Sequence, residues 1–417
     1  MLGVALFTAL IGGCIYKLIT GLRSVRWLPG LRVPFAPMSL FGVLVPTYWW
    51  NPGSKWSWEW RQTNFMSHKH EIISIVPFIW GRPAYHVGSL NAIKQILEAE
   101  QRRTIKPRDL MVPLLLWGEN LISSNDEMWK RHRRIMGPAF SLSTLQVLNK
   151  TWNQLEKAMH NLVATRKKEL DALGVGGERP DDGVFTRLVS ELDEDAKHGL
   201  DKGEVIGNTF AMLFAGHETT ANTLTATFGF LALYPEHQDQ VAAEIRAVLG
   251  DEDPTLDTLS ALPILQACFY ESLRFFPAGV TLTRDVLEDI SVTVSRPSHQ
   301  TICLEKGSRI IIDMVGVHHD PNVFQDPESF KPERWHNVPE HLVSMFGLGP
   351  RGCIGRKFAV TEAMCFLALF LRDWEVDIVL QDGESREEYK DRVMTKAGMV
   401  GLAFGVGPIT LQVSKRS

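Results

Sequence analysis

The sequence FGLGPRGCIGRKFA, at residues 346–359, places one cysteine in a glycine-rich loop directly before a helical pattern. The first N–H groups of a helix have no partner within the helix, and the helix dipole favours negative charge there. Cys353 therefore has surroundings that stabilise a thiolate, and Arg351 adds a cation beside it. Four glycines allow a tight turn and the close approach of a flat ligand: Gly347, Gly349, Gly352 and Gly355.

A lone thiolate is better suited to be the axial ligand of an iron atom than to bind zinc, which takes four ligands. The alternative is a structural cysteine in a helix-entry loop.

Charge and cysteine content exclude several classes of protein. The chain has 417 residues and a formal net charge of −4, a balance that gives no sign of nucleic-acid binding. Its five cysteines are odd in number and form no CxxC pair, which argues against a disulfide framework or a structural zinc site. A reducing compartment fits better. Cys268, Cys303 and Cys365 lie among apolar residues and are expected to be buried.

The first twenty residues contain a single charge, Lys17. A membrane-spanning helix needs about 20 mostly apolar residues, and a lysine near its end can extend to the headgroups. Arg23, Arg26 and Arg32 follow, so the positive-inside rule places the rest of the chain in the cytosol. A cleaved signal peptide is the alternative, weakened by the lack of basic residues before the apolar run. We expect a transmembrane anchor over 1–20, a proline-containing linker over 21–50 and one large domain over 51–417.

The remaining pattern predicts a mostly α protein with a minor β part. Helices are expected near 89–100, 126–137, 202–234, 236–249 and 263–275, and from Cys353 to about 373. Residues 280–315 are strand-like, and 399–413 resemble a hairpin. Five tryptophans between 49 and 60 suit either packing or contact with a membrane interface, and the sequence does not decide between the two.

Polar residues interrupt two apolar helical patterns. In FAGHETT, residues 214–220, they predict a local helix break that faces a cavity, where Thr219 can bind a carbonyl or water and Glu218 can pass a proton. A polar notch in the packing is the alternative. In YESLRFFP, Glu271 and Arg274 share one helix face and can pair in a buried setting.

Several motifs together resemble the cytochromes P450, the haem-thiolate monooxygenases. The pattern F-x-x-G-x-R-x-C-x-G fits Phe346, Gly349, Arg351, Cys353 and Gly355 without a gap, and matches the haem-binding signature of that family. The family's A-G-x-E-T, E-x-x-R, P-E-R-W and W-x-x-x-R motifs match at Ala215–Thr219, Glu271–Arg274, Pro332–Trp335 and Trp129–Arg133.

The resemblance implies a role for each of these residues. Cys353 would be the axial ligand of haem b, with Arg351, Arg133, Arg284 and the Trp129 indole holding the haem carboxylates. Glu218 and Thr219 would deliver protons, and a Glu271–Arg274–Arg334 network would be structural. The other basic residues of the 126–137 helix, Lys130, Arg131 and Arg134, are expected to be solvated or to face a redox partner, with solvation favoured.

The resemblance also implies a cytochrome P450 fold. It further implies that the chain is a eukaryotic microsomal enzyme of fungal-like type. The enzyme would oxygenate a lipophilic molecule at the endoplasmic reticulum membrane, with electrons from a separate NADPH-cytochrome P450 reductase and with cytochrome b5 as an alternative donor. A haem-thiolate isomerase or dehydratase that uses no O2, and a truncated remnant without activity, remain alternatives.

One segment departs from the family pattern. Gly216 follows Trp129 after 87 residues, and family members usually have about twice as many there. The missing part is expected before about Leu162, in the stretch from Leu148 to Leu162. We interpret the chain as the product of an incomplete gene model or a splice form that lacks several helices.

Overall fold

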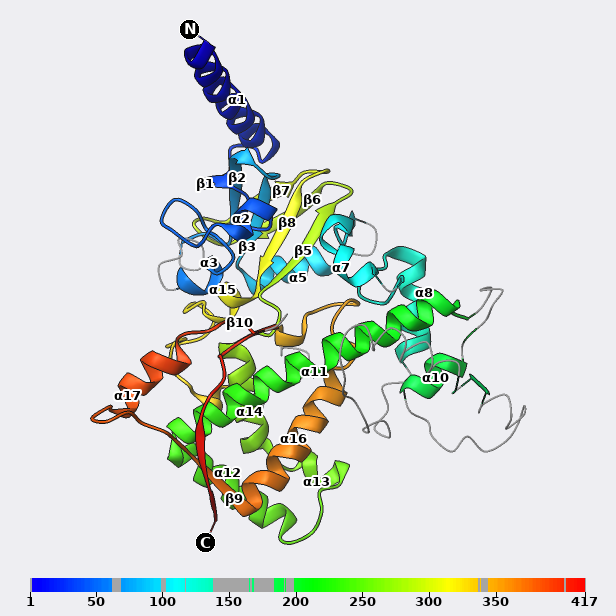
Figure 1. The fold of residues 1–417 in the computed structure, drawn as a ribbon, viewed down its shortest axis with the longest axis vertical. Coiled ribbons are helices and arrows are strands. Elements are labelled where there is room, and N and C mark those ends of the chain that lie inside the picture. Colours follow the sequence, from blue (N-terminus) through cyan, green and yellow to red (C-terminus); the bar gives the residue numbers. More distant parts are fainter. Residues whose placement is uncertain are drawn as a thin grey trace. The chain divides into compact units, whose positions relative to one another are not determined.

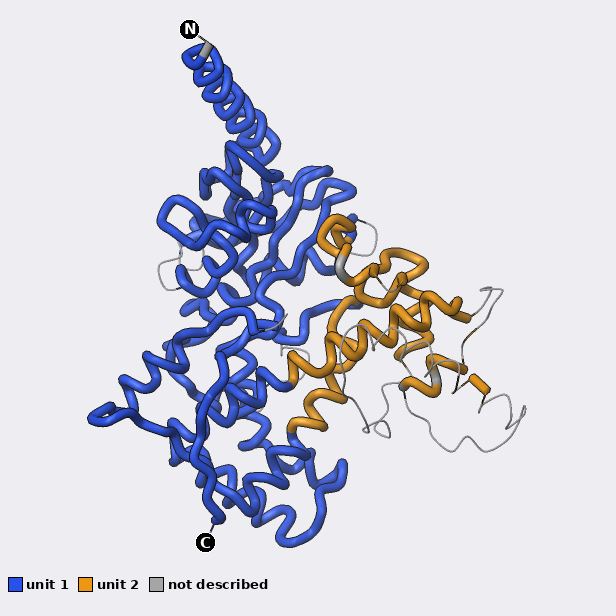
Figure 2. Tube along the Cα trace, viewed as in Figure 1, with its two compact units in different colours: residues 1–105, 221–350, 364–417 blue, residues 106–220, 351–363 orange. Residues whose placement is uncertain are grey.

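The computed structural model describes residues 2–61, 69–98, 103–116, 118–137, 165, 167–168, 184–190, 192, 199–336, 338, 344–400 and 403–416. These residues separate into two compact units (Figure 2). Unit 1 comprises residues 1–105, 221–350 and 364–417, and unit 2 comprises residues 106–220 and 351–363. The boundaries fall inside two long helices, α11 (Lys202–Leu233) and α16 (Arg356–Asp373). The expected shortened stretch lies outside the described residues.

Unit 1 begins with helix α1 (Leu2–Ser24), shown in dark blue in Figure 1. Its segment Gly3–Ser24 is long and apolar enough to cross a membrane, judged by length and composition alone. Its last two turns pack on the body of the unit through Leu18 and Leu22. Gly21 allows this approach, because a Cβ there would lie 2.6 Å from Val76 Cγ1.

A six-stranded mixed sheet forms the β part of unit 1, in the order β1-β2-β3-β8-β5-β4. The strands are β1 (Gly30–Phe35), β2 (Ile72–Trp80), β3 (Ala84–Val87), β4 (Thr104–Ile105), β5 (Thr281–Val286) and β8 (Arg309–Asp313). β1 and β3 run parallel to β2 and β8 respectively, and the other pairs are antiparallel.

Strand β1 lies inside the segment that the sequence predicts to be a linker. Residues 30–35 pair with β2 in parallel, and the register shifts between Val33 and Phe35, on either side of Pro34. Proline has no N–H to donate, and β1 is an edge strand, where such a residue is tolerated. Pro34, expected to belong to a proline-containing linker, therefore lies within a strand of unit 1.

Helices cover the sheet and build the rest of unit 1. They are α2 (Leu40–Leu44), α3 (Trp56–Glu59), α5 (Leu90–Glu98), α12 (Pro235–Leu249), α13 (Leu256–Ser260), α14 (Pro263–Phe275), α15 (Met314–His318) and α17 (Arg386–Tyr389). Three smaller two-stranded sheets pair β6 (Ile290–Val294) with β7 (Gln300–Leu304), β10 (Gly398–Val400) with β11 (Ala403–Gly405), and β9 (Trp374–Ile378) with β12 (Leu411–Lys415). The C-terminal residues expected as one hairpin are thus divided between two sheets.

The tryptophans near residue 50 differ in burial. Trp56 and Trp58 are buried in unit 1, whereas Trp49 is 89% exposed and Trp50 is 41% exposed. Trp58 is fixed by a hydrogen bond from its Nε1 to the Thr395 carbonyl. Packing therefore explains the later tryptophans and leaves the earlier ones at the surface.

Within the described residues of unit 2, the regular elements are helices, joined by turns and by an isolated β-bridge between Leu192 and Leu200. Unit 2 contains α7 (Val112–Leu115), α8 (Asp126–Met136), α10 (Val184–Ser190), the first part of α11 and the first two turns of α16. One apolar cluster holds these elements together, with Leu121, Met136, Leu188 and Phe210 among its buried members. The boundaries of α8 and α11 agree with those expected from the sequence to within one residue.

Candidate functional site

Cys353 lies in unit 2, three residues before α16 begins at Arg356. Cys353 is exposed to solvent, although many protein atoms also surround its sulfur. Burial by the surrounding protein raises the pKa of its thiol, while a hydrogen bond from the Gly355 N–H and the charges of Arg133 and Arg356 act to lower it. The backbone donor expected from the sequence is therefore present at the sulfur atom.

Arg133 and Arg351 lie close to the cysteine loop. Arg133 Nη1 donates to the Gly352 carbonyl at 3.0 Å, and Arg351 Nη1 donates to the Ser124 carbonyl at 2.9 Å. The Arg351 guanidinium also covers the Trp129 ring at 4.0 Å. Helix α8 thus presents Trp129 and Arg133 to the loop from one face, as their spacing of four residues predicts.

Arg133 is a partly buried cation next to the cysteine loop. Burial lowers the pKa of Arg133, opposed by the Cys353 charge. Within the part of the chain that the structure describes, no carboxylate forms an ion pair with it. A half-buried guanidinium with this surrounding favours an anionic ligand beside Cys353.

Glu218 and Thr219 lie on α11, also within unit 2. The helix is continuous through FAGHETT, so the expected local break is wrong. The threonine hydroxyls explain this, because Thr219 Oγ1 donates to the Ala215 carbonyl at 2.7 Å and Thr220 Oγ1 to the Gly216 carbonyl at 3.2 Å. Such bonds satisfy the polar groups inside a regular helix. Gly216 is exposed, and a Cβ there would meet nothing within 4 Å.

One apolar cluster links the cysteine loop to this part of α11. Ile354, adjacent to Cys353, packs against the buried cluster of unit 2, and so does Phe214 at the start of FAGHETT. Trp129 packs against the same cluster. The structure therefore brings three of the sequence motifs together around one core.

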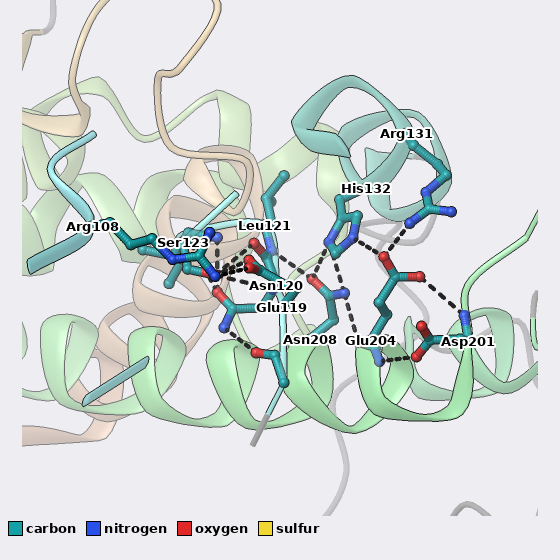
Figure 3. A network of polar contacts seen from close by, with 12 residues as sticks. Arg108, Glu119, Asn120, Leu121, Ser123, Arg131, His132, Asp201, Glu204 and Asn208 are labelled. Carbon is teal, nitrogen blue, oxygen red and sulfur yellow. Dashed lines mark hydrogen bonds and ion pairs between the residues drawn. The ribbon is translucent and has the colours of Figure 1, made fainter. Parts of the chain in front are cut away.

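A polar network ties α8 to the start of α11 (Figure 3). Glu204 accepts hydrogen bonds from Arg131 and contacts His132 Nε2 at 3.1 Å. Asn208, one turn later, accepts from the Leu121 N–H at 2.8 Å and contacts His132 Nδ1. His132 and Asn208 are fully buried, so the network fixes α8, and with it Trp129 and Arg133.

The sequence analysis missed this network and placed Arg131 wrongly. Lys130 and Arg134 are exposed as expected, but Arg131 is three-quarters buried by its contact with Glu204. A sequence signal was available: Asp201 and Glu204 form a reciprocal cap at the start of α11, and an Asp-x-x-Glu pattern before an apolar run predicts it.

The third constellation lies in unit 1. Glu271 and Arg274 on α14 are both fully buried and form two hydrogen bonds of 2.8 and 2.9 Å. Arg334 Nε reaches Glu271 Oε1 at 3.2 Å, and Trp335 Nε1 donates to Glu271 Oε2 at 2.8 Å. Burial acts to raise the pKa of Glu271, but its bonds to Arg274 outweigh this and the pKa is lowered.

Phe346, Gly349 and Arg284 also belong to unit 1. Gly349 has a φ of +71°, a conformation that favours glycine and explains its place in the loop. Arg284 is buried on β5, where its Nη1 donates to the Thr283 carbonyl at 2.8 Å. The two units are described separately, so the position of Arg284 toward Cys353 stays a prediction.

Comparison with known proteins identifies the family. The family described as Cytochrome P450 matches residues 140–401, more than half of the chain. The chain belongs to the cytochrome P450 family. Members of this family are haem-thiolate proteins, which agrees with the cysteine loop and with the mostly α architecture.

Individual relatives are similar over different shares of their length. Cytochrome P450 monooxygenase 124 of Postia placenta is 26% identical, over 90% of this chain and 91% of the relative. Human cytochrome P450 3A5 is 28% identical over 66% of this chain and 51% of its own length. Human cytochrome P450 4F12 is 36% identical over 44% of this chain and 35% of its own length.

The match to the Postia placenta protein extends over 478 positions, more than the 417 residues of this chain. That relative therefore has residues without a counterpart here. Their expected location between Leu148 and Leu162 stays a prediction.

The residues around Cys353 fit a haem of this family. An accessible sulfur with a backbone donor suits an iron ligand, and Arg133 and Arg351 suit two carboxylates. The clear space at Gly216 permits a flat group to approach the backbone of α11 within the same unit as Cys353.

Proposed function

We propose that this chain is a haem b-dependent monooxygenase that inserts one oxygen atom from O2 into a lipophilic small molecule. Cys353 carries the proposal, because its exposed thiol receives the Gly355 N–H at the start of α16, in a chain of the cytochrome P450 family. The Postia placenta relative is named a monooxygenase, which supports the same reaction class. The haem supplies the redox chemistry that activates dioxygen.

Residues of unit 2 would hold the haem. The Cys353 sulfur would bind the iron, and the N–H of Gly355 would limit its charge donation by a hydrogen bond. Arg133 and Arg351, with the Trp129 indole, would bind the carboxylates. Arg284 of β5 is the further candidate for that task.

Thr219 and Glu218 would handle protons. A hydroxyl that donates to the Ala215 carbonyl still has lone pairs with which to accept a hydrogen bond from water. Thr219 can therefore orient a water molecule, while the partly exposed Glu218 exchanges protons with solvent. Phe214, which is only partly buried on the same helix, supports an apolar substrate.

We further propose that electrons come from NADPH-cytochrome P450 reductase, with cytochrome b5 as a possible second donor, at the endoplasmic reticulum membrane. The apolar helix α1 and the similarity to the human relatives support this setting.

Isotope labelling tests the proposed reaction. The full chain in lipid vesicles, with reductase and NADPH, should convert a panel of lipophilic compounds under ¹⁸O2 into products that carry one ¹⁸O atom. The control omits NADPH. Products formed without NADPH, or products without ¹⁸O, would instead indicate an isomerase or dehydratase and contradict the proposal.

A further inference from the structure

His132 lies one residue before Arg133 on α8 and is fully buried in unit 2. Its two ring nitrogens contact two successive turns of α11 (Figure 3). Nε2 lies 3.1 Å from Glu204 Oε1, and Nδ1 lies 3.0 Å from Asn208 Nδ2. Because residues four apart share one face of a helix, both nitrogens of His132 join α8 to the same face of α11.

The neighbouring hydrogen bonds define which nitrogen of His132 carries the hydrogen. The Oδ1 atom of Asn208 accepts from the Leu121 N–H at 2.8 Å, and its Nδ2 atom donates to the Glu204 carbonyl at 2.7 Å. The second hydrogen of this amide is available to His132 Nδ1, so Nδ1 accepts and Nε2 donates to the Glu204 carboxylate. An apolar side chain at position 132 would therefore remove one hydrogen bond from each of these two buried partners.

Arg133 connects this buried contact to the cysteine loop. Its Nη1 donates to the Gly352 carbonyl at 3.0 Å, one residue before Cys353. An arginine side chain has many rotamers, so its guanidinium takes one position only where its backbone and its partners are fixed. The contacts of His132 fix the backbone from which the side chain of Arg133 extends to the loop.

We propose that His132 is a positioning residue for the haem, which holds Arg133 where its guanidinium can bind the Cys353 loop and a haem carboxylate together. This inference rests on the role of Arg133 in the proposed function. His132 acts through Arg133 and not by contact with the haem.

His319 in unit 1 is a matched control for the contact itself. It is also buried, and its Nδ1 lies 2.8 Å from Glu328 Oε1, much as His132 contacts Glu204. Both carboxylates also pair with an arginine. Replacement of either histidine by leucine therefore removes an equivalent buried contact, but only position 132 adjoins an arginine of the candidate haem site.

A comparison of four variants tests the proposal: His132→Leu, Arg133→Leu, the two combined, and His319→Leu. Two properties of the haem-loaded fraction of the full chain are measured, the rate of haem transfer to apomyoglobin and the midpoint reduction potential. The melting temperature of each variant reports the loss of stability separately.

We expect His132→Leu to lose haem about tenfold faster than the native chain, as for other residues that orient a ligand-binding side chain. The combined variant should lose haem no faster than Arg133→Leu, because both substitutions remove the same interaction. The midpoint potential should fall in His132→Leu as in Arg133→Leu, because a displaced cation no longer offsets the negative charge of the haem carboxylates. His319→Leu should lower the melting temperature only.

Two results would overturn this inference alone: effects of His132→Leu and Arg133→Leu that multiply in the combined variant, or a His132→Leu variant that behaves like His319→Leu. Either would show that His132 only stabilises unit 2. If Arg133→Leu keeps the native rate of haem loss, the role of Arg133 in the proposed function fails as well. Where His132→Leu does not fold, His132→Asn replaces it in the same comparison, since it retains a polar atom at the Nδ1 position and loses only the contact with Glu204.

Discussion

At the scale of single residues, burial separates interactions that look alike in the sequence. Glu271–Arg274 and Glu127–Lys130 are both acid–base pairs three residues apart on a helix. The first pair is fully buried, whereas the side chains of the second are 85% and 59% exposed. Because a buried charge depends on its partner and an exposed one is solvated, the two pairs should differ in their effect on stability.

We expect Glu271→Gln to destabilise the fold by about 3 kcal/mol or more, because Arg274 would remain buried without its counter-charge. Thermal unfolding measures this, and Glu127→Gln is the control that should leave the melting temperature unchanged. If Glu271→Gln also leaves the melting temperature unchanged, the Glu271 network does not stabilise unit 1.

Thr219 permits a similar matched comparison on α11. Thr219 and Thr225 both donate to the carbonyl four residues earlier, at 2.7 and 2.8 Å. If Thr219 orients water for proton delivery, Thr219→Ala should lower the product formed per NADPH severalfold, whereas Thr225→Ala should not. An unchanged product yield in Thr219→Ala would assign this hydroxyl a structural role only.

At the scale of elements, the buried cap of α15 should respond to pH. Burial raises the pKa of Asp313 to about 7, although its carboxylate accepts the Gly316 N–H at 2.9 Å. The unfolded carboxyl loses its proton near pH ~4, so between about pH 4 and pH 7 the folded state binds more protons. The contribution of Asp313 to stability therefore falls as the pH rises through this range.

Asp313→Asn removes the titration and retains a side-chain oxygen for the cap. Relative to the native chain, the free energy of unfolding of the variant should therefore rise by roughly 2 kcal/mol from pH 5 to pH 8. The measurement is the melting temperature of the variant minus that of the native chain, which should increase over the same range. A difference that stays constant or falls over this range would show that the pKa of Asp313 is not raised in the folded chain.

Local patterns predicted most helices but not the pairing of distant segments. The boundaries of α8, α11, α12 and α14 follow from periodicity, proline positions and caps, which are local properties of the chain. The pairing of residues 30–35 with β2 depends on contacts more than 40 residues apart, which no local pattern contains. The expected break at FAGHETT failed because composition does not show that Thr219 bonds to Ala215.

The short, continuous motifs led us to expect Trp129 and Arg351 near the Cys353 loop, and the structure shows that proximity, while their roles at a haem stay a prediction. The Arg131–Glu204 contact joins residues 73 positions apart, and a run of basic residues alone suggested solvent exposure. Only the fold identifies Glu204 as the partner of Arg131, because contacts between helices far apart in the sequence depend on packing.

At the scale of the whole molecule, the short segment before α11 should limit cofactor retention. A chain that lacks helices present in its relatives exposes apolar faces, and net stabilities of only about 5–15 kcal/mol do not tolerate a large loss of burial. We expect the purified full chain to hold well below one haem per chain and to lose it faster than the Postia placenta relative under the same conditions. A stable chain with one haem bound would show that the short segment is a compact variant.

The central claim is that Cys353 ligates the haem iron, and the spectrum of the reduced protein with carbon monoxide tests it most directly. The haem-loaded fraction of the native chain should give the thiolate-type spectrum, and so should Cys365→Ala, which alters a partly buried cysteine of α16. Cys353→Ala should lose it. A thiolate-type spectrum that persists in Cys353→Ala would contradict the assignment.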